Sequence, residues 1–191
     1  MILYRFLERM NFRGIARRLY RVTITGADRI PSKDAVILVA NHESMFDPWL
    51  LALATPRPVR YMAKSELWRI PLVGRALDAF GTFPVERGTG DGTAMSRAAS
   101  LLHEGEVIGI FPQGTSKQLP ERPFHRGAAR LALATGAQIV PVRLVGTRGF
   151  LRPGRPATQV HVGEPIVVQQ AKPTVAAARA LTAQVERALT A

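Results

Sequence analysis

Short apolar runs of strand length alternate with segments of helical periodicity through most of this chain. Residues 36–40 and 107–111 are continuous apolar runs, which is typical of strands buried on both faces of a parallel sheet. Shorter apolar or alternating segments predict further strands at residues 21–25, 59–63, 82–85, 138–144 and 158–162. We expect the last of these strands to lie at an edge of the sheet.

Helices are predicted between the strands, wherever apolar residues recur three or four positions apart. The segments that fit this spacing are residues 93–103, 127–135 and 173–189. Gly105 and Gly136 follow the first two closely, and glycine is the common residue at the end of a helix. The alternation of strands and helices predicts an α/β fold, in which helices flank a mostly parallel central sheet. The 191 residues suffice for a single domain of this kind, which we place at residues 21–191.

The first twenty residues carry a different pattern. Apolar side chains at helical spacing lie beside a ridge of arginines that recur every fourth residue: Arg5, Arg9, Arg13 and Arg17. A basic amphipathic helix of this kind lies in the interface of an anionic bilayer. The same pattern fits an ordinary amphipathic helix packed against the domain, and Gly14 is able to divide it into two shorter helices.

Composition narrows the class of partner. The chain has 26 Lys and Arg against 14 Asp and Glu, and its formal net charge of +12 predicts attraction to something anionic. It has no cysteine, and its four histidines are scattered without a metal-binding spacing, so we predict no metal site. No apolar run reaches the ~20 residues that a bilayer span requires, and the amino terminus lacks a signal-peptide layout. We therefore expect a peripheral protein on the cytoplasmic face of the membrane.

Two polar clusters follow the two buried strands directly, at residues 41–47 and 111–117. Ligand sites in open α/β sheets gather at the carboxyl ends of the strands, which is where these clusters fall. His42 is a candidate general base, and Asp47 is a candidate for fixing its orientation. Asp47 followed by Pro48 is also a common helix start, with the aspartate as N-cap, and both roles can coexist.

The spacing Asn41-His42-x-Ser44-x-x-Asp47 resembles the first signature, Asn-His-x-x-x-x-Asp, of the lysophospholipid acyltransferase family. The resemblance is to the bacterial type, which makes phosphatidic acid from lysophosphatidic acid. Further stretches that are similar to the family's motifs follow in the family's order, at residues 62–74, 81–87, 111–115, 124–127 and 139–142. Together the motifs extend the likeness over about residues 20 to 165.

The resemblance implies a direct acyl transfer to the free hydroxyl of 1-acylglycerol-3-phosphate, as part of phospholipid biosynthesis. Acyl-CoA or acyl carrier protein would be the co-substrate, and no further cofactor is implied. His42 would take the proton from the acceptor hydroxyl, and Asp47 would hold the imidazole. The chain has no Gly-x-Ser-x-Gly segment for a serine nucleophile, which agrees with transfer in one step.

The resemblance also implies residues that bind the substrates. Lys64 and Arg87 would face the phosphate of the acceptor, Arg87 through its bidentate guanidinium. Backbone amides around Gly114 and Thr115 are candidates to stabilise the oxyanion that develops during transfer. Without the resemblance, each of these charged residues is an ordinary solvated surface charge.

One motif departs from the family pattern. The family's Glu-Gly-Thr-Arg is replaced here by Gln113-Gly114-Thr115-Ser116, so a carboxylate and a guanidinium are both lost. Lys117, the next residue, is a candidate replacement for the missing arginine. The change leaves two further readings open: an acyltransferase with a different lyso-lipid or hydroxyl acceptor, and a catalytically silent lipid-binding relative.

Two other classes of function fit the sequence less well. A nucleic-acid-binding module would explain the positive charge, but the basic residues are not interleaved with aromatic residues and no reading motif is present, so we predict no nucleic-acid partner. The glycine-rich segment 88–92 suggests a nucleotide site. It lacks the third glycine and the lysine that phosphate-binding loops require, which favours a surface loop.

Overall fold

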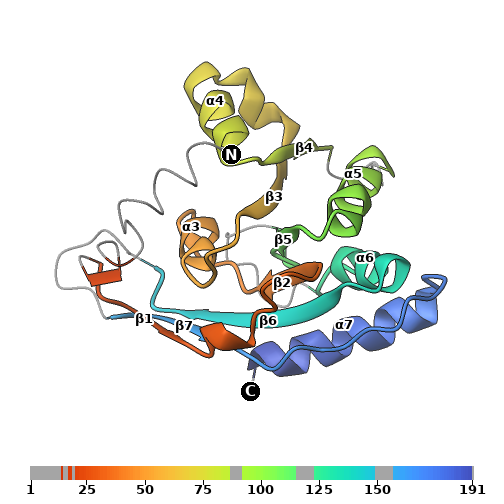
Figure 1. The fold of residues 1–191 in the computed structure, drawn as a ribbon. Helices are drawn as coiled ribbons and strands as arrows, with labels where there is room; N and C mark the ends of the chain where they lie inside the picture. Colours follow the sequence, from red (N-terminus) through yellow and green to blue (C-terminus); the bar gives the residue numbers. More distant parts are fainter. Residues whose placement is uncertain are drawn as a thin grey trace.

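The computed structural model of the chain describes residues 14, 17, 18, 20–86, 92–114, 123–148 and 157–190. Its centre is a seven-stranded sheet in the order β1-β7-β6-β2-β5-β3-β4 (Figure 1). The strands are β1 (Val22–Thr25), β2 (Val36–Ala40), β3 (Val59–Lys64), β4 (Phe83–Val85), β5 (Val107–Ile110), β6 (Gln138–Val145) and β7 (Thr158–Val162). All neighbours are parallel except β6 and β7, which confirms the predicted α/β fold with a mostly parallel sheet.

The helices follow the strands in the order that the sequence predicts, with additions. The α-helices are α3 (Asp47–Ala52), α4 (Pro71–Ala79), α5 (Gly92–His103), α6 (Gly127–Thr135) and α7 (Val175–Thr190), and the 3-10 helices are η1 (Ala27–Arg29) and η2 (Ser65–Arg69). Helix α7 begins at Val175 and not at residue 173, because the Thr174 hydroxyl accepts a hydrogen bond from the Ala177 amide (3.2 Å) as an N-cap. Helix α4 was not among the predicted helices.

The expectation that residues 158–162 form an edge strand was wrong. Strand β7 pairs with β1 on one side and with β6 on the other, so β1 and β4 are the edges. Thr158, Val160 and Val162 are buried while Gln159 is exposed. The alternation shows that one face of β7 is buried. It does not show whether the strand has one neighbour or two.

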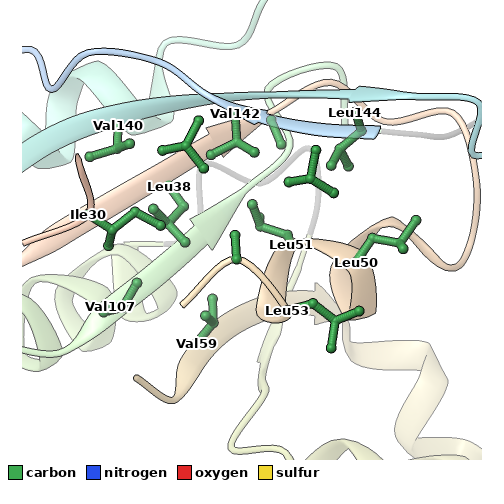
Figure 2. Packing of buried hydrophobic residues seen from close by; sticks show 14 of the residues in the cluster. Ile30, Leu38, Leu50, Leu51, Leu53, Val59, Val107, Val140, Val142 and Leu144 are labelled. Atoms are coloured by element: carbon green, nitrogen blue, oxygen red, sulfur yellow. The ribbon is translucent and has the colours of Figure 1, made fainter. Parts of the chain in front are cut away.

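Two hydrophobic cores lie on opposite faces of the sheet, and β2 contributes to both. Leu38 faces the core that includes α3, whereas Ile37 and Val39 face the core built with α5, α6 and α7. All five β2 residues are fully buried, which explains why this strand is a continuous apolar run. Figure 2 shows the first core, where Leu50 and Leu51 approach side chains of the sheet.

One half-buried cation holds together the loops that precede β2 and β5. The Arg57 guanidinium donates hydrogen bonds to the backbone carbonyls of Pro31 and Asp34 (2.7 Å each) and of Gly105. Burial lowers the pKa of Arg57, and the nearby Glu106 and Asp34 oppose that effect. An arginine stays charged at any ordinary pH, so these bonds persist.

The predicted helix at residues 1–20 lies outside the described residues apart from Gly14, Arg17, Arg18 and Tyr20. Gly14, Arg17 and Arg18 are helical and exposed. In the part of the chain that the structure describes, no helix is both long and apolar enough to cross a membrane.

Gly109, in the middle of β5, offers a test of how tightly this sheet is packed. A Cβ at this position would lie 2.3 Å from Cε1 of Tyr61, whose hydroxyl donates to the Pro48 carbonyl (2.6 Å). We therefore expect Gly109→Ala to destabilise the protein by about 1–3 kcal/mol, measured by urea unfolding, because the ring has to move.

The matched control is Gly127→Ala, where a Cβ meets nothing within 4 Å. This change at the start of α6 should alter the free energy of unfolding by less than about 1 kcal/mol. Equal effects of the two substitutions would contradict the close approach of Tyr61 to the strand.

Candidate active site

The loop that leaves β2 brings His42 and Asp47 together. Nδ1 of His42 lies 2.9 Å from Oδ2 of Asp47, within hydrogen-bond distance. The Asp47 side chain is fully buried, whereas that of His42 is 17% exposed. The pair thus combines a sheltered carboxylate with an imidazole that remains accessible to a ligand.

The Asp47 carboxylate organises the whole loop. Its Oδ2 accepts hydrogen bonds from the backbone amides of Glu43 (2.6 Å) and Ser44 (2.7 Å) as well as contacting His42. Its Oδ1 is buried and has no hydrogen-bond partner among the described residues. Three contacts on one oxygen fold the chain back on itself, which is how two residues five positions apart meet.

Asp47 does not act as the N-cap of α3, which corrects one of the two roles that its sequence context suggested. The N-cap is Phe46, and no side chain caps the helix. Asp47 is the first helical residue, and Pro48 follows it. Its side chain points back to the loop because the loop amides and His42 supply three donors there.

The contact with Asp47 also determines which ring nitrogen of His42 can act as a base. An ionised carboxylate only accepts hydrogen bonds, so the bond requires the proton on Nδ1. The lone pair of the neutral ring is then on Nε2, which has no partner among the described residues. The ring stacks on Phe111, with centroids 4.4 Å apart and an angle of 28° between the planes, and this contact limits its rotation.

Gln113 joins the second polar cluster to the first. Its Oε1 accepts a hydrogen bond from the backbone amide of His42 (2.6 Å) across the two adjacent strands β2 and β5. The departure from the family pattern thus lies in direct contact with the candidate base. The sequence marked Gln113 only as a substitution, and nothing in its spacing indicated the contact.

Asn41 anchors the loop to the other neighbour of β2. Its side-chain amide donates to the carbonyl of Leu144 (2.9 Å) and accepts from the amide of the same residue (2.7 Å). Leu144 belongs to β6, which pairs with β2. Asn41 therefore fixes the position of the residue next to His42, a role that the motif alone did not reveal.

Gly114 closes the turn after β5. It has a φ of +70°, and its amide donates to the Phe111 carbonyl (3.0 Å), so this bond occupies the amide that was expected to face an oxyanion. A Cβ on Gly114 would lie 3.3 Å from the His125 ring, which places a second histidine against this turn.

The predicted phosphate-binding residues are only partly described. Lys64 is exposed at the carboxyl end of β3, two strands from β2 in the sheet and at the same edge as His42. Arg87, Thr115 and Lys117 lie outside the described residues. Within the described ranges, no three His, Asp or Glu residues form a group that could hold a metal ion.

Comparison with known proteins agrees with this arrangement. A family model described as Acyltransferase matches residues 21–145, which include the six strands β1 to β6 in chain order and both polar clusters. The chain belongs to the acyltransferase family. The match covers the larger part of the chain and includes His42, Asp47, Lys64 and Gln113.

Relatives within this acyltransferase family differ in the acceptor that they are named for. The chain is 35% identical over 133 residues to a 1-acyl-sn-glycerol-3-phosphate acyltransferase of Borreliella burgdorferi, covering 68% of this chain and 53% of the relative. It is also 35% identical over 144 residues to a lyso-ornithine lipid O-acyltransferase of Pseudomonas aeruginosa, covering 73% of this chain and 52% of the relative. The chain thus spans about half the length of these curated relatives.

A solved structure shares the fold. The 1-acyl-sn-glycerophosphate acyltransferase of Thermotoga maritima aligns with a TM-score of 0.72 and 23% identity, covering 94% of this chain and 76% of that one. The Thermotoga maritima enzyme and this chain therefore share the same arrangement of sheet and helices.

The Asn41 anchor predicts a loss of stability when it is removed. Asn41→Ala leaves the amide and the carbonyl of Leu144, a residue 2% exposed, without partners. Because an unsatisfied buried group costs about 1–3 kcal/mol, we expect a loss of this size or larger in urea unfolding.

Gln159→Ala is the matched control, because this exposed side chain on β7 accepts a hydrogen bond from His161 at the surface (2.9 Å) and leaves no buried group unpaired when it is removed. It should change the free energy of unfolding by less than about 0.5 kcal/mol. An Asn41→Ala protein as stable as the control variant would show that Leu144 finds other partners.

Proposed function

We propose that the protein transfers a fatty acyl group from acyl-CoA or acyl carrier protein to the free hydroxyl of 1-acylglycerol-3-phosphate, giving phosphatidic acid. The observation that carries the proposal is the His42–Asp47 contact of 2.9 Å at the carboxyl end of β2, inside the region that matches the family. The names of relatives such as the Borreliella burgdorferi enzyme support the choice of substrate.

In the proposed reaction, His42 acts as the general base. Nε2 takes the proton of the acceptor hydroxyl while the hydroxyl oxygen attacks the carbonyl carbon of the thioester. Asp47 keeps Nδ1 protonated and stabilises the imidazolium that forms. The contact with Phe111 and the bond from the His42 amide to Gln113 hold the base in place during this step.

The tetrahedral intermediate then collapses to products. The carbon–sulfur bond breaks, the thiolate leaves, and the imidazolium returns its proton to the sulfur, which restores neutral His42. No acyl-enzyme forms, and no cofactor takes part. Thr115, which follows Gly114, is the remaining candidate to donate a backbone amide to the oxyanion.

Recognition of the acceptor phosphate is assigned to three cations. Lys64 is the described member, at the edge of the sheet that also carries His42. We propose Arg87 as the bidentate contact and Lys117 as the substitute for the arginine that the family has after its Gly-Thr pair. All three cations would lower KM for a phosphorylated acceptor, Arg87 through two hydrogen bonds and each lysine as a point charge.

We further propose that the protein works as a peripheral protein at an anionic membrane surface, on the cytoplasmic side. Its net charge of +12 supports attraction to such a surface, and its lack of cysteine fits a reducing compartment. The arginine ridge of residues 1–20 is the segment of the sequence best suited to lie in the headgroup region.

A second candidate has a different acceptor. Gln113 carries no charge where the family has a carboxylate, and it touches the amide of His42. The Pseudomonas aeruginosa relative, which has the same 35% identity as the Borreliella burgdorferi one, is named for a lyso-ornithine lipid. An acyltransferase that prefers a lyso-lipid without a phosphate at this position is therefore the runner-up.

The catalytic pair is tested by replacing each member. We expect His42→Ala to lower kcat for acyl transfer by roughly 10²- to 10⁴-fold, because general base catalysis contributes about that factor. Asp47→Asn should lower kcat by a similar factor, because an amide does not hold the same tautomer. The kcat of each variant is measured with labelled acyl-CoA and lysophosphatidic acid.

His103→Ala is the control, because this histidine is exposed at the end of α5. It should keep wild-type kcat. Transfer that persists undiminished in His42→Ala would refute the proposed base, and a wild-type protein that binds lyso-lipid without turning it over would favour the silent relative.

The choice of acceptor is tested with a panel of lyso-lipids at saturating acyl-CoA. If the main proposal holds, kcat/KM is highest for lysophosphatidic acid, and Arg87→Gln and Lys117→Ala raise KM for it. A higher kcat/KM for lyso-ornithine lipid, reversed toward lysophosphatidic acid by Gln113→Glu, would support the runner-up instead. Glutamate keeps an acceptor for the His42 amide, so this variant changes charge while preserving that bond.

A further inference from the structure

Helix α4 turns most of its apolar residues to the outside of the protein, whereas a helix that covers a sheet turns them toward the sheet. Of its nine residues only Gly74 is buried, and it packs on Trp68 of η2, where an added Cβ would lie 3.3 Å from Cα of Trp68. The inner side is completed by the bond from Trp68 Nε1 to Asp78 Oδ1 (2.8 Å). The side of the helix that carries Gly74 and Leu77 therefore faces the protein, with Asp78 at its border.

The outer side of α4 is apolar. Leu72, Ala76 and Phe80 lie one turn apart on this side, and Val73 lies beside them. Leu72 is 79% exposed, and Ile70, just before the helix, is 52% exposed. No described residue of η2 or α4 belongs to a hydrophobic core of the protein. Figure 1 shows this unit beyond the end of β3, away from α6 and α7.

A helix with an exposed apolar face requires a partner that accepts apolar surface. We propose that Ile70, Leu72 and Val73, here called the α4 face, enter the acyl-chain boundary of an anionic membrane. This proposal deepens the proposed function, on which it rests, by naming a membrane-contacting surface outside the amino-terminal segment.

Charge favours a lipid surface as the occupant. Arg69 and Arg75 are exposed beside the α4 face, while Asp78 is engaged with Trp68. Arginines at the border of an apolar face suit anionic headgroups, each contributing attraction near the surface. A second copy of this chain is disfavoured, because both copies carry a net charge of +12.

The position of the α4 face relative to His42 also favours a membrane as its partner. The η2–α4 unit follows directly on the carboxyl end of β3, at the edge of the sheet that carries His42. Met45, between His42 and Asp47, is 80% exposed at that edge. An acceptor whose acyl tail stays in the bilayer would reach His42 from this side, so the α4 face would hold the site against the surface that contains the substrate.

The first experiment measures binding to vesicles without any need for activity. The full chain is floated with vesicles of phosphatidylglycerol and phosphatidylethanolamine. We expect Leu72→Gln/Val73→Gln to lower the partition coefficient about tenfold with no change in charge. Val167→Gln/Val175→Gln is the matched control, because these residues are 77% and 70% exposed elsewhere and should leave the partition coefficient within twofold.

The absence of cysteine allows a second, local measurement. A single cysteine at Leu72→Cys carries an environment-sensitive dye, whose emission should shift to the blue on addition of vesicles and be quenched by spin-labelled acyl chains. The same dye at Val167→Cys should show neither effect. This readout does not depend on how a glutamine pair affects folding.

Three outcomes would overturn the proposal. One is a Leu72→Gln/Val73→Gln protein whose partition coefficient equals that of the wild type. Another is a dye at position 72 whose emission does not change when vesicles are added. The third is a double variant that binds vesicles normally but loses affinity for acyl carrier protein, which would assign the α4 face to a protein partner.

Activity on two forms of the acceptor separates this proposal from the proposed function. We expect the double variant to retain kcat/KM on a short-chain, monomeric acceptor and to lose it on an acceptor embedded in vesicles. Vesicle binding through the α4 face without any transfer by the wild type would refute the enzyme but not the surface. If the wild type and the double variant transfer acyl groups equally well to both forms of the acceptor, the role of the α4 face is refuted but the acyltransferase activity is not.

Discussion

The geometry of the site depends on one buried carboxylate oxygen. Oδ2 of Asp47 contacts two backbone amides and the ring of His42, all within 2.9 Å. A buried charge is tolerated only when donors surround it, so the loop can close only in a conformation that supplies all three. The same requirement that folds the chain after β2 therefore also orients the imidazole.

The sheet supplies the frame for this loop. Strand β2 is central, with β5 on one side and β6 on the other, and hydrogen bonds from both sides hold the loop. Gln113, which follows β5, binds the amide of His42, and Asn41 binds the backbone of β6. Because β2 is buried on both faces, the residues beyond it begin from a rigid position, and small polar contacts suffice to fix the rest.

The sequence predicted those parts of the structure in which pattern and burial coincide. Strand β2 and helix α6 were clear, because a run of buried apolar residues or a regular spacing followed by a glycine has few other interpretations. His42 and Asp47 were predicted to meet because the motif resembled a known one, while their contact itself depends on a loop conformation that spacing does not encode. The pairing of β7 with β1 and the contact of Gln113 with His42 join residues 136 and 71 positions apart in sequence, and local patterns do not report such contacts. Helix α4 was not predicted, because it is only nine residues long and contains Pro71 and Gly74, which weaken a helical pattern.

The separation of the η2–α4 unit from both cores has a consequence for how the protein can diverge. Substitutions on β2 disturb two cores at once, whereas those on the outer side of α4 disturb neither. Natural variation can therefore accumulate in this short segment without endangering the scaffold. The outer surface of α4 can therefore change in sequence while the arrangement of His42 and Asp47 stays the same.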